Sequence, residues 1–141
     1  MSDAKYWMAL DQVKGMGPAN LRLVHESLVR TGLSMRDMFE LSANEIQHEF
    51  GLGEKIAQSV VEAKGSIERC EDVCQKLESA GVEIILFFEK RYPPRLERML
   101  KNTAPPMLFL FGNSALLSEK GAAILGDINV SEKGRLVASF A

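Results

Sequence analysis

The sequence predicts an α+β fold in which a helical domain precedes a domain that contains β-strands. From Lys5 to about Ala80, apolar residues recur at helical spacing between short glycine-containing breaks. After Gly81, runs of β-branched and aromatic residues replace that spacing. We therefore expect a helical domain over residues 1–80 and a second domain over residues 81–141.

The composition is that of a globular protein. Of the 141 residues, 46% are apolar and 26% are charged, which is enough to bury a core without disorder. No apolar stretch approaches the roughly 20 residues that a bilayer requires, and the first residues lack the pattern of a secretory signal. We expect a cytoplasmic protein without membrane contact.

Two helices in the first domain carry local start or stop signals. Ser42 and Glu45 have the spacing of a capping box, so a helix should begin after Ser42. Another helix should have Ser66 as its N-cap and end before Gly81. Its buried face should hold Ile67, Cys70, Cys74 and Leu77. The two cysteines are therefore expected to be buried thiols rather than metal ligands.

The second domain contains three apolar runs, residues 82–88, 107–111 and 122–125, which we interpret as buried strands. The segment that starts near Ser131 and includes Leu136 has the pattern of a helix. A strand followed directly by a helix is the first half of a βαβ unit.

A repeat marks the helical domain. Gly15-Met16-Gly17 recurs 36 positions later as Gly51-Leu52-Gly53, and each copy precedes apolar residues at helical spacing. This pattern is typical of a helix-hairpin-helix, whose glycines hold conformations that other residues avoid and whose helix amides face a phosphate. Gly15, Gly17, Gly51 and Gly53 are thus candidate DNA contacts. Tandem hairpins also serve as protein-interaction modules, so both interpretations stay open.

The positive charges concentrate in one segment, although the chain as a whole carries a net charge of −2. Residues 89–101 hold five cations and two carboxylates around a Tyr-Pro-Pro turn. Arg91, Arg95 and Arg98 are candidate phosphate contacts in this basic segment. A solvated helix face explains such a cluster equally well.

Three segments after the repeat have an order and spacing typical of one family. They are residues 80–85 (AGVEII), 91–96 (RYPPRL) and 105–113 (PPMLFLFGN). Together with the hairpins, they resemble the DNA-processing protein A family, also called Smf, over nearly the whole chain. The resemblance implies a tandem helix-hairpin-helix (SAM-like) domain joined to a Rossmann-like α/β domain. It also implies binding of single-stranded DNA, loading of the RecA recombinase and a role in natural transformation, and it leaves a homodimer open.

The resemblance further implies a phosphate-binding turn that opens the last helix. Gly126, Ser131 and Gly134 fit the pattern of that family, and Lys133 adds a positive charge. An anion fits such a turn because helix amides and the helix dipole point toward it. Asp127 and Ile128 depart from the pattern and weaken anion binding. We also expect an incomplete Rossmann-like domain, because the chain ends within this helix.

Three classes of function therefore compete. A recombination mediator that binds single-stranded DNA is favoured by the repeat, the basic segment and the family order. The alternatives are a nucleotide-binding Rossmann enzyme fragment and a helix-hairpin-helix module that binds proteins. The sequence contains no evident nucleophile–base pair or paired carboxylates, so we expect no catalysis, no cofactor and no metal site.

Overall fold

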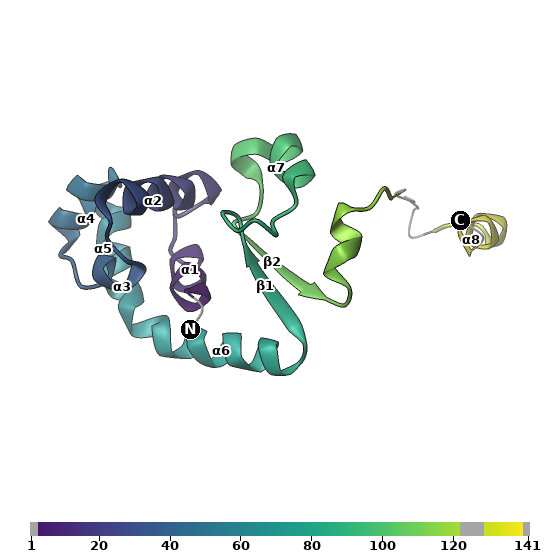
Figure 1. The fold of residues 1–141 in the computed structure, drawn as a ribbon, viewed down its shortest axis with the longest axis horizontal. Helices are drawn as coiled ribbons and strands as arrows, with labels where there is room; N and C mark the ends of the chain where they lie inside the picture. Colours follow the sequence, from purple (N-terminus) through teal and green to yellow (C-terminus); the bar gives the residue numbers. More distant parts are fainter. Residues whose placement is uncertain (1–2, 122–128, 140–141) are drawn as a thin grey trace.

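The computed structural model describes residues 3–121 and 129–139 and shows a helical half followed by a small sheet with further helices (Figure 1). The helices of the first half lie where the sequence predicts helical structure. They are α1 Ala4–Asp11, α2 Pro18–Thr31, α3 Met35–Met38, α4 Ala43–Phe50, α5 Glu54–Ala63 and α6 Ile67–Ser79. The mixed α+β content is confirmed.

Two of these helices begin with a reciprocal cap. At α4, the Ser42 side chain accepts from the Glu45 amide while the Glu45 carboxylate accepts from the Ser42 amide, as the sequence predicts. Ser34 and Asp37 form the same arrangement at α3, with an aspartate in place of the glutamate. Both helices therefore start at a position determined by their own sequence.

Ser66 is the N-cap residue of α6, as predicted, but its side chain makes no capping hydrogen bond. Residues Lys64–Ser66 form a 3₁₀ turn, η1, and the Ser66 hydroxyl donates to the Ala63 carbonyl instead of capping α6. At the other end, Gly81 has a φ of 78°, the left-handed conformation expected after a helix. Cys70 and Cys74 are buried free thiols on the inner face of α6, as predicted.

Strand β1, Val82–Leu86, pairs antiparallel with β2, Met107–Phe111, and Ile84 lies opposite Phe109. The chain segment that connects the two strands contains helix α7, Pro94–Leu100, and the 3₁₀ turn η2, Lys101–Thr103. The 3₁₀ turn η3, Ser114–Ser118, and helix α8, Glu132–Ser139, follow. The predicted third strand, residues 122–125, lies outside the described residues.

The prediction that residues 82–88 and 107–111 form buried strands is only partly correct. Phe87 and Phe88 leave the sheet after β1, and Phe109 and Phe111 on β2 are exposed. Successive side chains of a strand point to opposite faces, so an uninterrupted apolar run does not require both faces to be covered.

One hydrophobic core joins the helices to the sheet. It includes Trp7 and Leu21 from the helical half and Ile85 and Tyr92 from the second half. The Trp7 ring meets the Phe87 ring edge to face, with 5.7 Å between centroids. Within the described ranges, no helix is long and apolar enough to cross a membrane.

Candidate nucleic-acid interface

The two glycine turns, Gly15-Met16-Gly17 and Gly51-Leu52-Gly53, have matching backbones. In each, the first glycine is left-handed, with φ of 88° at Gly15 and 65° at Gly51. The second glycine is the N-cap of the next helix and is extended, with φ of −77° at Gly17 and −65° at Gly53. The expectation that both glycines of a turn need special conformations is therefore wrong for Gly17 and Gly53.

Each turn is packed against the opposite repeat. Met16 and Leu52, the central residues, are 2% and 3% exposed. A Cβ atom at Gly15 would lie 3.4 Å from the Ile56 side chain of α5, and one at Gly51 would lie 3.8 Å from Leu23 of α2. Each turn therefore lies against the helix that follows the other turn.

The helix starts at the two turns differ in electrostatics. Helix α2 begins with Pro18, which has no amide hydrogen, and its first turn carries no acidic residue. Helix α5 begins with Glu54, whose carboxylate occupies the positive end of the helix dipole. An incoming phosphate would therefore be repelled more strongly at the second turn.

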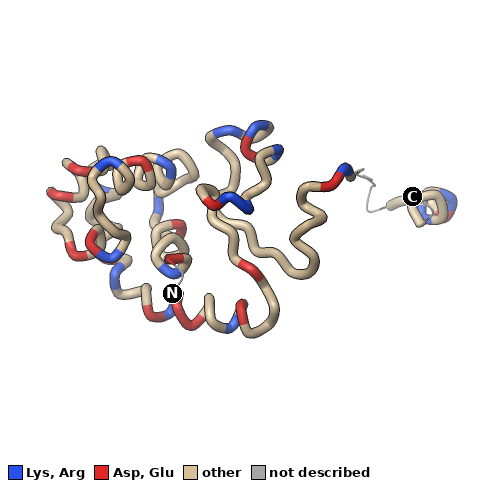
Figure 2. The backbone as a smooth tube through the Cα atoms, viewed as in Figure 1, with Lys and Arg blue, Asp and Glu red and all other residues tan. Residues whose placement is uncertain are grey.

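The basic segment forms α7 and the residues beside it, and blue positions gather there in Figure 2. Arg95 and Arg98 are exposed, and no ion pair among the described residues engages either of them. Lys101 follows α7 with a φ of 49°, a strained conformation for a residue with a side chain. These cations are available to a ligand.

Arg91 differs from the other two predicted arginines because it is already paired. Its guanidinium lies 2.6 Å from the Glu83 carboxylate and 3.0 Å from the Glu89 carboxylate. Hydrogen bonding to Glu89, followed by the charges of both acids, raises the pKa of Arg91. The adjacent cavity of about 410 Å³ is also lined by Glu78, so this place favours phosphate less than α7 does.

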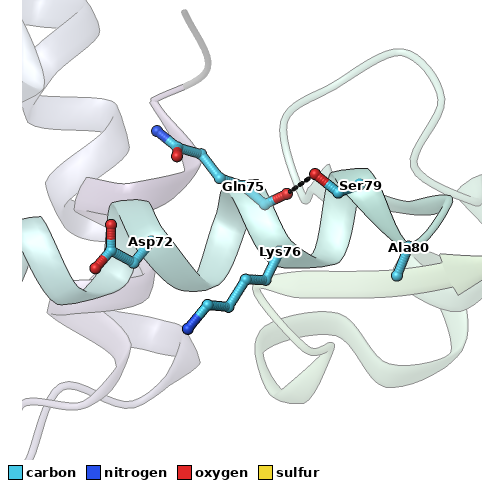
Figure 3. Close-up of a pocket in the computed structure, with 5 residues that line it drawn as sticks. All are labelled: Asp72, Gln75, Lys76, Ser79 and Ala80. Atoms are coloured by element: carbon cyan, nitrogen blue, oxygen red, sulfur yellow. Dashed lines mark hydrogen bonds between the residues drawn. The ribbon is translucent and has the colours of Figure 1, made fainter.

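A second hollow lies along α6 and is lined by Asp72, Gln75, Lys76, Ser79 and Ala80 (Figure 3). The side chains of Asp72, Gln75 and Lys76 point in different directions, and the Ser79 hydroxyl donates to the Gln75 carbonyl at 2.7 Å. A ligand site needs polar groups that converge. The polar side chains that line this hollow do not converge, so we do not assign a ligand site to it.

The predicted phosphate turn is only partly described, because Gly126, Asp127 and Ile128 lie outside the described residues. Ser131 caps α8, since its hydroxyl accepts from the Gly134 amide at 3.2 Å. A Cβ atom at Gly134 would lie 2.7 Å from the Val130 side chain, so the glycine allows this close approach. Lys133 is exposed, and Figure 1 shows α8 apart from α7 and the glycine turns.

Sequence reasoning missed the residues that join the two halves. The Arg22 side chain of α2 lies over the Phe87 ring at 4.7 Å from its centroid, and His25 stacks on Phe88 at 4.3 Å between centroids. Nothing near Arg22 in the sequence signals these contacts, because the partners lie more than 60 positions away. Among the residues that the structure describes, no cluster of three or more metal-binding side chains is present.

Comparison with known families supports the assignment made from the sequence. Residues 83–140 match the family model of DNA recombination-mediator protein A. The matched range begins inside β1 and contains the basic segment, β2 and α8. No curated protein and no solved structure matches the chain.

Proposed function

We propose that this chain, whose residues 83–140 match the family model of DNA recombination-mediator protein A, binds single-stranded DNA as part of a recombination-mediator role. The observation that carries the proposal is the pair of exposed arginines on α7, Arg95 and Arg98, inside the matched range. Phosphates attract such cations without regard to base sequence. A mediator that accepts many DNA strands requires this kind of contact.

The glycine turns supply a second point of contact in this proposal. The first turn of α2, which follows Gly17, carries no acidic residue, whereas the first turn of α5, which follows Gly53, carries Glu54. Helix amides contact phosphate without reading bases. We expect the first turn to contribute more to affinity than the second.

RecA recombinase is the proposed protein partner, and the proposed activity is delivery of this recombinase to DNA rather than catalysis. The family resemblance carries this part of the proposal, together with roles in natural transformation and DNA processing. Direct binding of RecA with no affinity for DNA would favour the protein-interaction alternative. Turnover of a nucleotide would favour the Rossmann enzyme alternative.

Neutralising the two free arginines tests DNA binding. We expect Arg95→Gln with Arg98→Gln to weaken binding to a fluorescent oligothymidylate and to reduce the salt slope of log K by roughly 1.4, about 0.7 for each lost contact. The matched control is Arg36→Gln with Arg69→Gln, which removes two exposed charges from the helical half. Fluorescence anisotropy across a salt series gives both slopes.

Arg91→Gln alone is the second comparison. We expect it to reduce the salt slope of log K by less than the roughly 0.7 expected for each of Arg95 and Arg98. The reason is that Glu83 and Glu89 already neutralise Arg91. Equal slopes for the α7 double variant and the control double variant would remove α7 from the DNA site.

A further inference from the structure

Arg22 is a cation from the helical half whose side chain is largely covered by the second half. Its side chain is 16% exposed, and its guanidinium carbon lies 4.7 Å from the centroid of the Phe87 ring. One nitrogen, Nη1, lies 3.7 Å from a carboxylate oxygen of Glu97 on α7. Arg22 therefore touches both the exit of β1 and the helix that carries the basic segment.

This placement leaves hydrogen bonds unmade. The Nε and Nη2 atoms of Arg22 are buried without an acceptor among the described residues. Burying a guanidinium with unpaired donors is costly, and the attraction to an aromatic face and one distant carboxylate offsets only part of that cost. A residue kept in such a place is a candidate for a role other than stability.

We infer that Arg22 is a positioning residue that holds α7 against α2 and thereby directs Arg95 and Arg98 outward. Successive residues of an α-helix are about 100° apart around its axis, so Arg95 lies about 200° from Glu97. Drawing Glu97 toward Arg22 places Arg95 on the side of α7 that faces away from Arg22, where it is exposed and borders an open hollow with Leu108 and Leu117. Arg98, about 100° from Glu97, projects to the side.

The other end of the basic segment is anchored independently. Tyr92 is buried, and its hydroxyl donates to the Pro105 carbonyl at 2.7 Å. With Tyr92 holding the start of the segment, the Arg22–Glu97 contact sets the rotation of the helix that follows. The inference about DNA rests on the function proposed above, whereas the inference about α7 does not.

Hydrogen exchange tests the positioning without DNA. In Arg22→Met, which keeps an unbranched apolar stem, amides 96–100 of α7 should exchange roughly twofold to thirtyfold faster, while those of α4 and α5 stay unchanged. Arg22→Lys retains the charge opposite Glu97 and should recover part of this protection. Arg69→Met, which removes an exposed arginine from α6, is the matched control.

The melting temperature separates positioning from general stabilisation. Because Arg22→Met also removes two buried unpaired donors, we expect its melting temperature to equal or exceed that of the unaltered protein. Unchanged exchange in α7 would overturn the inference. Faster exchange throughout the helical half, with a lower melting temperature, would overturn it as well.

A double-mutant cycle then asks whether Arg22 acts on DNA through α7. Arg22→Met should weaken oligothymidylate binding roughly twofold to thirtyfold in the unaltered protein and leave it unchanged when Arg95 and Arg98 are already glutamine. An equal loss in both backgrounds would mean that Arg22 acts on DNA independently, which contradicts the positioning role. If the α7 double variant binds DNA normally, the proposed function fails, and the exchange result still decides whether Arg22 positions α7.

Discussion

At the scale of single residues, the two glycines of each turn meet different steric demands. Gly15 and Gly51 are left-handed, a conformation that brings the Cβ atom of other residues too close to the following carbonyl oxygen. Gly17 and Gly53 have ordinary extended angles, and a Cβ atom there would meet no atom within 4 Å among the described residues. Only the first glycine of each turn is required by its backbone.

Serine substitutions at the four positions test this difference. We expect Gly15→Ser and Gly51→Ser each to lower the free energy of unfolding by roughly 1–2 kcal/mol, the cost of a left-handed residue with a side chain. Gly17→Ser and Gly53→Ser should leave it unchanged or raise it slightly, because serine is a favourable N-cap. Urea unfolding followed by circular dichroism measures all four, and equal losses within a turn would contradict the assignment.

His25 makes stability depend on pH. Burial lowers the pKa of its imidazole below the usual value of 6.5, and the charge of Glu26 opposes this shift. The native state therefore binds fewer protons than the unfolded state, so the contribution of neutral His25 is complete above pH 6.5 and is lost as the pH falls below it.

We expect the free energy of unfolding to fall as the pH drops below about 6.5, and His25→Gln to flatten that decline. His48→Gln, which alters an exposed imidazole on α4, is the control and should retain the slope of the unaltered protein. Urea unfolding at several pH values provides the measurement. A slope that survives His25→Gln would assign the pH dependence to other groups.

At the scale of elements, the reciprocal caps decide where α3 and α4 begin. Each serine satisfies a helix amide that has no partner inside the helix, and each acid satisfies the amide of that serine. Hydrogen bonds from Ser42 lower the pKa of Glu45, and those from Ser34 lower the pKa of Asp37. Both caps therefore favour the ionised acid.

Removal of a capping hydroxyl should destabilise the protein. We expect Ser42→Ala to lower the free energy of unfolding by roughly 0.5–2 kcal/mol, and Ser34→Ala to have an effect in the same range. Ser59→Ala inside α5 is the control, where the hydroxyl donates to the Lys55 carbonyl and alanine favours the helix. Thermal unfolding at pH 7 measures the three variants. A loss at Ser59 equal to that at Ser42 would argue against a capping role.

At the scale of the whole molecule, one core crosses the predicted domain boundary at residue 80. Trp7 of α1 packs against Phe87, and Ile85 and Met107 belong to the same cluster as the helices. The division into residues 1–80 and 81–141 stays a prediction. Residues that share a core lose their packing together when either part unfolds.

We therefore expect the helices and the β1–β2 sheet to unfold in one cooperative transition. Trp7 is the single tryptophan and reports the packing between the two halves, whereas far-ultraviolet circular dichroism reports the helices. The two signals should change at the same urea concentration. Separate midpoints would show that the halves are independent domains.

The sequence by itself determined the features that depend on neighbours within a few positions. The Ser42 cap depends on two residues three positions apart. Helix periodicity, the buried cysteine stripe and the glycine repeat are patterns that recur along the sequence. The order of the carboxy-terminal segments likewise predicted the resemblance to the family whose model matches residues 83–140.

Only the tertiary structure decided which of the arginines in the basic segment have an ion-pair partner among the described residues. Arg91, Arg95 and Arg98 are equivalent in the sequence pattern, yet only Arg91 meets Glu83 across the fold. The contact between Arg22 and Glu97 joins residues 75 positions apart. Such pairs form because burial of a shared core brings distant segments together. Local propensity does not predict which distant residues will then be in contact.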